Sequence, residues 1–520
     1  MKASVVIMKR FVCAVLIVTI LVSGLFFVRV AHATIVNGTL TSDTEWTQAD
    51  SPIYFNGSVM VSSNVTLTID AGVTVNFGMY WLNVAGTLIA VGTASNPITF
   101  LASNNSSSYP SNYVATATIS FGPISIPSSE LNCSGSIIRY TSLNEVSVQI
   151  SNSSPKIDNC LFDFTAPYTQ PISIVGGSPT ISNCTINYNV QGFTEYGNAN
   201  SISVFNGDPL ITNDIFEGNY YNLTSNDICV ENGAPVITDN SFAGNYASSN
   251  NNGITVNSGT AQITYNKFQG NSYLTGVVDA SPSSFTVSGN VFSNCLSGVT
   301  AQAGSTLTVE GNSFLRGTDG IDVNTGASLT ITDNLIDSNS RYGINGGGDI
   351  TFNTITNNQI GIHNPPLGTI SNNNIVGNTQ WSVTATIEDI DAQNNWWGIA
   401  DARTINQTIY DLKCDYHLGT ITFVPFLTAP DPSAPVIPSS TPTITPVPTP
   451  TTSPQQTSQP IIQTPSPTPT QNSQSFVYQV GSLLNLNVIT TFTAVTLVLA
   501  WVVVTLGYAA KKHFQTKKKN

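Results

Sequence analysis

The chain has 520 residues, of which only 9% are charged, far below the roughly 25% of an average soluble protein. All 29 acidic residues lie between Asp43 and Asp431, where seven basic residues accompany them, so this part has a net charge near −22. Such a surface repels nucleic acids and anionic membranes. The composition therefore argues against nucleic-acid binding and favours a rigid extracellular domain.

The first residues have the pattern of a secretory signal. Basic residues, among them Lys9 and Arg10, precede an apolar run from Phe11 to Val28, and Ala-His-Ala ending at Ala33 follows. A basic segment, an apolar segment and a small-x-small site are typical of a signal peptide. We predict a signal peptide over residues 1–33, with an uncleaved anchor as the alternative.

A six-residue phrase with asparagine at its fourth position recurs along the middle of the chain. It reads Ile-Thr-Asp-Asn-Ser-Phe at 237–242 and Val-Ser-Gly-Asn-Val-Phe at 287–292. Cys160, Cys184 and Asp214 hold the asparagine position in earlier copies. A self-similar period near 22 residues is typical of a solenoid. The asparagines of the phrase are Asn240, Asn266, Asn290, Asn312, Asn334, Asn353 and Asn373.

A second column supports the same register. Pairs of Gly with Ile or Val begin at Gly253, Gly276, Gly298, Gly320, Gly343 and Gly361. The segments between turns are short and rich in β-branched residues, and no window has an apolar helical stripe. We therefore predict an all-β fold, a parallel β-helix in which every coil pairs with the next at roughly 4.8 Å.

The coil geometry explains the asparagines. An amide at the same turn of successive coils can bond both to the next coil and to the local backbone, so no polar group is left unpaired. The Phe or Ile two residues later forms an apolar stack inside; a role as a sugar platform is the alternative. Asn378 is expected to lie outside the ladder.

The repeats resemble right-handed parallel β-helix proteins of the pectate-lyase-like superfamily, over about residues 34–427. The opening segments 65–77 and 82–93 look like first coils of such proteins, and Asn-Asn-Trp-Trp-Gly at 394–398 looks like their end piece. We predict an N-terminal cap with first coils over 34–132, repeats over 133–393 and an end cap over 394–428. Trp396 and Trp397 are predicted to cover the last coil, with sugar binding as the alternative.

The resemblance implies either catalysis or binding, because this superfamily includes lyases, hydrolases and adhesins. Its hydrolases use paired aspartates, and its lyases use carboxylates with an Arg or Lys base. Asp319 and Asp322 lie three apart, so in a strand they would face opposite sides. We therefore interpret the acids as solvated turn charges, and an active site is the alternative. The weak catalytic candidates are Asp319, Asp322, Asp333, Asp337 and Arg341.

No metal or other cofactor is predicted, although a structural calcium ion is an alternative use of the acids. The repeats also resemble a periplasmic β-helix protein of copper processing. The chain lacks Cys-x-x-Cys and His-x-x-x-His motifs and has only four Met, which argues against soft metals. Cys160 and Cys184 are expected to be buried, stacked thiols, with a disulfide as the alternative. Candidate glycosylation sites are Asn104, Asn105 and Asn222.

The C-terminal part has the pattern of a tethered surface protein. Residues 429–475 are rich in Pro, Thr and Ser and predict a disordered stalk. After a juxtamembrane segment (476–487), residues 488–510 carry no charge and are long enough to span a bilayer. The basic tail (511–520) predicts a cytoplasmic C-terminus. This order resembles the layout of archaeal surface proteins.

These features together predict a single-pass plasma-membrane protein with an extracellular solenoid. Its partners would be a polysaccharide or a cell-envelope surface, and the membrane itself through the C-terminal helix. We expect a non-catalytic role in envelope architecture, adhesion or glycan binding. A membrane-tethered polysaccharide lyase or glycoside hydrolase is the alternative.

Overall fold

The computed structural model describes residues 33–102, 117–122, 133, 135–164, 170–188, 200–217, 226–243, 251–270, 273–324, 326–365 and 368–437. The predicted signal peptide, stalk, juxtamembrane segment, transmembrane helix and tail lie wholly or mostly outside these residues. So do Asn104, Asn105 and Asn222. Within the described ranges, no helix is long and apolar enough to cross a membrane.

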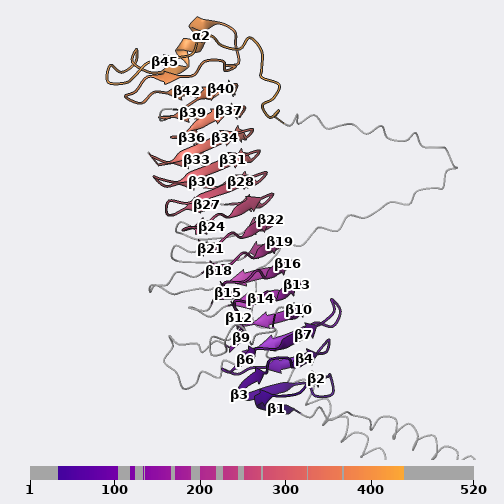
Figure 1. The fold of residues 1–520 in the computed structure, drawn as a ribbon. Coiled ribbons are helices and arrows are strands. Elements are labelled where there is room, and N and C mark those ends of the chain that lie inside the picture. The colour runs from indigo at the N-terminus through magenta and orange to yellow at the C-terminus, as the bar shows by residue number, and fades with distance from the viewer. Residues whose placement is uncertain are drawn as a thin grey trace, which may run out of the picture. The chain divides into compact units, whose positions relative to one another are not determined.

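The described chain winds into coils, and strands of successive coils stack in parallel in three columns (Figure 1). The predicted all-β parallel β-helix is confirmed. The first column contains β2 (Thr44–Trp46), β4 (Thr66–Ile69), β7 (Thr87–Val91), β10 (Ile137–Arg139), β13 (Lys156–Asp158), β16 (Thr180–Ser182), β19 (Leu210–Thr212), β22 (Val236–Thr238), β25 (Gln262–Thr264), β28 (Ser284–Ser288), β31 (Thr306–Glu310), β34 (Ser328–Thr332), β37 (Asp349–Thr351) and β40 (Ile370–Ser371).

The second column carries the Phe or Ile of the recurring phrase. It contains β5 (Thr74–Asn76), β8 (Ile98–Leu101), β11 (Thr141–Asn144), β14 (Leu161–Phe164), β17 (Thr185–Tyr188), β20 (Ile215–Glu217), β23 (Ser241–Ala243), β26 (Lys267–Gln269), β29 (Val291–Ser293), β32 (Ser313–Leu315), β35 (Leu335–Asp337), β38 (Thr354–Thr356) and β41 (Asn374–Val376). In this column Phe216, Phe242, Phe268, Phe292 and Phe314 stack with ring centroids 4.6–4.8 Å apart. The rings are buried, so the column faces the core.

The third column carries the Gly-Ile pairs. It contains β6 (Trp81–Val84), β9 (Ala117–Phe121), β12 (Val146–Ser151), β15 (Ile172–Val175), β18 (Asn200–Phe205), β21 (Asn226–Asn232), β24 (Asn251–Val256), β27 (Leu274–Asp279), β30 (Ser297–Ala301), β33 (Asp319–Val323), β36 (Tyr342–Asn345), β39 (Ile360–His363), β42 (Trp381–Thr384) and β44 (Ile409–Tyr410). β1 (Thr34–Leu40) pairs with β3 (Ile53–Val61), and β3 pairs with both β5 and β6, so it spans two columns.

The asparagines of the phrase form one stack at the corner between the first and second columns. Asn312 shows the pattern: its backbone N–H and its Nδ2 both donate to Asn334 Oδ1, at 2.9 and 3.0 Å, and Nδ2 also donates to Val287 O at 2.9 Å. The preceding residue turns the corner in the left-handed region, as Gly311 does with φ +65°. The stack continues from Asn373 to Asn395, one coil beyond the predicted ladder.

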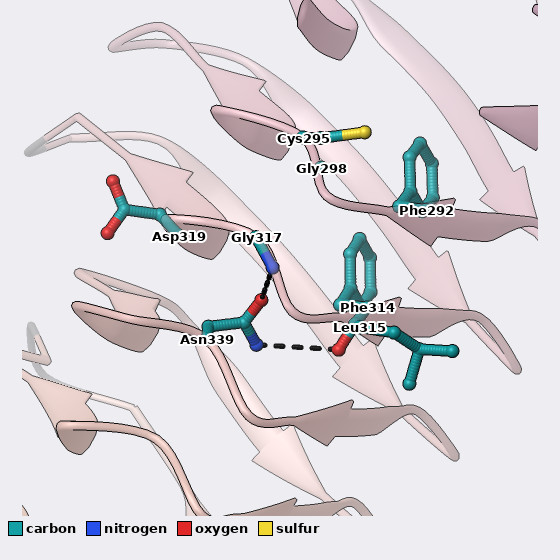
Figure 2. A pocket seen from close by; sticks show the side chains of 8 residues that line it. All are labelled: Phe292, Cys295, Gly298, Phe314, Leu315, Gly317, Asp319 and Asn339. Atoms are coloured by element: carbon teal, nitrogen blue, oxygen red, sulfur yellow. Dashed lines mark hydrogen bonds between the residues drawn. The ribbon is translucent and has the colours of Figure 1, made fainter. Parts of the chain in front are cut away.

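A second stack occupies the corner between the second and third columns. Asn339 donates from N and Nδ2 to Asn358 Oδ1, and Asn358 donates in the same way to Asn378 Oδ1. Asn339 also bonds to Gly317 N and Phe314 O (Figure 2). Asn378 therefore lies outside the first stack, as expected, but it belongs to a second stack because this corner repeats the same hydrogen-bonding geometry.

The last coil is covered by residues 385–427. Trp397 is 5% exposed and packs edge-on against Phe423, while Trp396 is half-buried and bonds through its backbone to Asn373 O and Ile375 N. Beside them are α2 (Ala402–Gln407) and the pair of β43 (Ile390–Asp391) with β45 (Ile421–Thr422).

The chain beyond this cover turns back along the outside of the second column. The backbone N and O of Asp431 bond to the side chain of Asn374 at 2.8 and 3.1 Å. One coil earlier, Thr354 donates its hydroxyl to Pro435 O. Thr354 and Asn374 are buried, and so is Ala434.

Asp214 takes the asparagine position in its coil. Its Oδ1 accepts from Cys184 N at 2.7 Å and its N donates to Asn240 Oδ1 at 2.9 Å, while Oδ2 is buried without a partner. Burial raises the pKa of Asp214 to about 7, with a further small rise from the charge of Asp158. A proton on Oδ2 would let Asp214 donate as an asparagine does. Cys184 lies one coil earlier and Cys160 two coils earlier, and both are free and buried.

The asparagine stack makes a first prediction. Replacing Asn312 with Leu removes the acceptor of Asn290 N–H and the donor to Val287 O. Leaving buried polar groups unpaired costs roughly 1–3 kcal/mol each. Chemical denaturation should show a loss of stability of that order. Asn324→Leu is the control, since Asn324 is exposed and in the described chain its side chain bonds only to Gln302; equal losses would contradict the stack's role.

A second prediction concerns pH. The pKa of Asp214 is about 7 in the folded chain, against 3.8 for an unperturbed Asp. Between these two pH values the folded chain keeps the Asp214 proton, whereas the unfolded chain has lost it. Stability therefore falls as pH rises from about 4 to 7, by on the order of 4 kcal/mol in total. Asp214→Asn should remove this slope in melting temperatures measured from pH 4 to 8. Asp208→Asn, at an exposed acid, should keep it; an unchanged slope in Asp214→Asn would contradict the assignment.

Candidate functional site

The five acidic and basic candidates do not form one cluster. Asp333 lies in the turn between β34 and β35, where its carboxylate accepts from the Thr332 hydroxyl at 3.4 Å. Asp337 ends β35 and accepts from Asn357 Nδ2 at 2.9 Å. In the described chain neither bonds to the other three candidates, so the site reduces to those three.

Asp319 and Asp322 lie on the same outer side of β33, contrary to the expected opposite faces. Ile321 is fully buried, and a Cβ added to Gly320 would lie 3.4 Å from Phe314 Cβ, so two consecutive positions face the core. Figure 2 shows the Asp319 side chain pointing away from the Phe314 ring. Simple strand alternation fails here because Gly320 has no side chain and allows the strand to bend inward.

Asp319 and Arg341 are engaged with each other. The Asp319 carboxylate is 1% exposed and accepts from Arg341 Nε at 2.9 Å, from Arg341 Nη2, and from Tyr342 N at 3.2 Å. This bond to Asp319 raises the pKa of Arg341 above its usual value. The guanidinium also lies 4.8 Å from the centre of the Tyr342 ring. The Asp319 carboxylate is therefore fully engaged by Arg341 and by the backbone of Tyr342.

The parallel register brings further residues to the same outer side. The residue after each Gly-Ile pair aligns with the corresponding residue of the next coil, as Asp322 does with Asn345. The Asp322 carboxylate accepts a hydrogen bond from Asn345 Nδ2 at 2.7 Å. We call this surface the C-terminal strip. It comprises Asp319, Asp322, Arg341, Tyr342, Asn345, His363, Trp381, Thr384 and Tyr410.

His363 is held neutral in the C-terminal strip. Its Nε2 lies 3.1 Å from Asn364 Nδ2, an atom that only donates, so Nε2 accepts and Nδ1 carries the proton. Nδ1 then donates to Thr384 Oγ1 at 2.8 Å. Burial, and next the charge of Arg341, lower the pKa of His363 below its usual 6.5. With both nitrogens bonded, His363 presents a ring face and no proton-exchanging atom.

Four rings line the strip. The His363 and Tyr342 rings are stacked, with centroids 4.3 Å apart and planes at 4°. The Trp381 and Tyr410 rings lie 5.1 Å apart at 51°. All four side chains are half-buried, so each keeps some surface open to solvent.

Tyr342, His363 and Trp381 are site residues that were not predicted from the sequence. The Tyr342 ring and the Thr384 hydroxyl that contact His363 lie in adjacent coils and not beside it in the sequence. The Gly-Ile spacing contained the signal: Asp322, Asn345 and His363 each follow such a pair directly. Their chemical diversity hides this column from a search for repeated residues.

The middle of the chain is similar to a known family. Residues 212–411 match the model of the family described as periplasmic copper-binding protein (NosD). This stretch is less than half of the chain, so the similarity applies to the stretch alone. No curated protein sequence matches the chain.

Three solved structures are similar at low identity. A mannuronic acid specific polysaccharide family 6 lyase from human gut microbiota is 15% identical, with TM-score 0.34, covering 70% of this chain and 85% of its own. A mutant of the periplasmic alginate epimerase AlgG is 13% identical, with TM-score 0.29 and coverages of 72% and 75%. The Dettilon tailspike protein is 13% identical, with TM-score 0.28 and coverages of 66% and 60%. At these values the likeness says nothing about activity.

The residues of the matched stretch do not fit a copper ion. It contains one histidine, two cysteines and no methionine. His363 has both nitrogens bonded, and burial raises the pKa of Cys229 and of Cys295 to about 12. In the described ranges, no group of three or more His, Cys, Asp or Glu side chains is placed to hold a metal.

The state of His363 can be tested directly. Because burial and Arg341 both disfavour the imidazolium ion, NMR titration should give His363 a pKa below 6.5, with the proton on Nδ1 at neutral pH. Arg341→Gln removes a positive charge and frees Asp319, so the pKa should rise. A pKa unchanged in this variant, or above 6.5 in the unaltered protein, would contradict the assignment.

Proposed function

We propose that this protein is a cell-surface β-helix protein, anchored in the membrane, that binds a glycan chain along the C-terminal strip without cleaving it. The observation that carries the proposal is the strip itself. It presents four half-buried rings beside hydrogen-bonding side chains, while its ion pair and its imidazole are bonded internally. Ring faces pack against the apolar C–H faces of sugars, and the flanking amide and carboxylate can bond to hydroxyl groups.

The absence of a free acid–base pair favours binding over catalysis. General acid–base catalysis needs a group that can pass a proton to the substrate. Asp319 and Arg341 neutralise each other, and His363 has no free nitrogen. Asp322 remains, but glycoside cleavage commonly uses two carboxylates.

The position outside the cell rests on sequence features beyond the described residues. An N-terminal segment with the pattern of a signal peptide, the Pro/Thr-rich stretch 429–475 and the uncharged run 488–510 followed by lysines support an exported, tethered protein. The archaeal-type layout and the roles in envelope architecture and adhesion are part of the same proposal.

A membrane-tethered polysaccharide lyase or glycoside hydrolase is the second candidate. One observation favours it: a carboxylate, a guanidinium, a tyrosine and an imidazole gather on one outer face. If substrate binding separated Arg341 from Asp319, this group would have the residue types of a catalytic site.

Glycan binding and turnover measured on the same purified protein separate the two candidates. Trp381→Ala should weaken binding to a captured glycan at least tenfold, about 1.4 kcal/mol, through lost ring contact. Tyr416→Ala is the control, because Tyr416 is 79% exposed and lies in the cover of the last coil, outside the strip. Melting curves verify that both variants fold. Release of new chain ends, abolished by Asp322→Asn, would contradict the non-catalytic function.

A further inference from the structure

We infer that the C-terminal strip selects uncharged pyranose chains and discriminates against acidic ones. This inference rests on the proposed glycan-binding function and names the class of glycan. It follows from the charges of the strip, their partners and the groups that continue the same face.

The single positive charge of the strip already has a partner, so a carboxylated sugar would have to compete with Asp319 for it; the Arg341 side chain is 50% exposed. Arg341 is its one cationic side chain, and it gives Nε and Nη2 to a buried carboxylate. If Arg341 turned away to bind a ligand, the Asp319 carboxylate, which is 1% exposed, would stay buried without its counter-ion. Burying an unpaired charge costs considerable free energy. Acidic glycans need such a cation, because guanidinium–carboxylate pairs supply their strong contacts.

Asp322 makes the strip negative. Among the described residues its side chain bonds to Asn345 Nδ2 alone, a neutral amide, so its charge has no ion-pair partner in the strip. His363 is neutral for the reasons given above, and the Asp319–Arg341 pair sums to zero. A bound polyanion would therefore face an uncompensated carboxylate, whereas a neutral sugar can donate hydroxyl protons to it.

Below the strip, the column of positions aligned with Asp319 is uncharged. At the outward position aligned with Asp319, the preceding third-column strands carry Asn226, Asn252, Thr275 and Ser297. Asn252 Nδ2 donates to Asn226 Oδ1 at 3.0 Å. Asn226 and Asn252 are half-buried, whereas Thr275 and Ser297 are buried. A chain that extends along the coils therefore meets these two amides at the coil spacing, roughly 4.8 Å, which is close to the length of one pyranose unit.

The experiment uses the full-length protein and pairs of polymers that differ only in charge. A neutral glucan, mannan and galactan are each compared with the same polymer oxidised to the carboxylate at C6. We expect at least one neutral polymer to bind at least tenfold tighter than its oxidised form, with little dependence on salt. Asp322→Lys should reduce this preference at least fivefold by admitting the oxidised polymer.

A matched control separates local from global charge. Asp337→Lys changes the net charge by the same amount, but Asp337 lies on the second column and should leave the preference unchanged. If the oxidised form binds as well as the neutral one, or if both lysine variants act alike, the inference is wrong while glycan binding stands. If no polymer binds and Trp381→Ala changes nothing on a glycan array, the proposed function fails with it.

Discussion

The fold depends on a hydrogen bond that each coil makes to the next at its corner. A buried asparagine gives two protons to the oxygen of the asparagine above and one more to the coil below, as Asn312 does with Asn334 and Val287. Side-chain amides thereby satisfy backbone groups that the turn removes from the sheets. Because each acceptor belongs to the next coil, the stack fixes the register of the three strand columns as well as their pairing.

That register creates the C-terminal strip. Residues about twenty apart in the chain become neighbours, so Asp322 reaches Asn345, and His363 reaches Thr384 and the Tyr342 ring. Hydrogen bonds also occupy the Asp319 carboxylate, the Arg341 guanidinium and both nitrogens of His363, the groups that acid–base catalysis would use. A surface rich in catalytic residue types thus becomes one with aromatic faces and a single uncompensated carboxylate.

The coil repeat and the parallel fold could be predicted because they follow from one residue type at a near-constant spacing. The second stack was missed because only Asn339, Asn358 and Asn378 carry amides there, while Cys295 and Gly317 hold the corresponding corner before them. The strip was missed for a related reason, since its column changes residue type in every coil. The prediction that Asp319 and Asp322 face opposite sides of the strand is wrong because the strand bends at Gly320, where side chains no longer alternate between the two faces.

The path of the chain after its last strand has a mechanical consequence. The backbone of Asp431 and of Pro435 is hydrogen-bonded to the side chains of Asn374 and Thr354, which lie one coil apart below the cover formed around Trp397. Tension on the downstream chain therefore meets these side bonds before it reaches the cover. The force is therefore transmitted to the side of the solenoid, through two coils. The cover, which shields the open end of the sheets, does not carry this force.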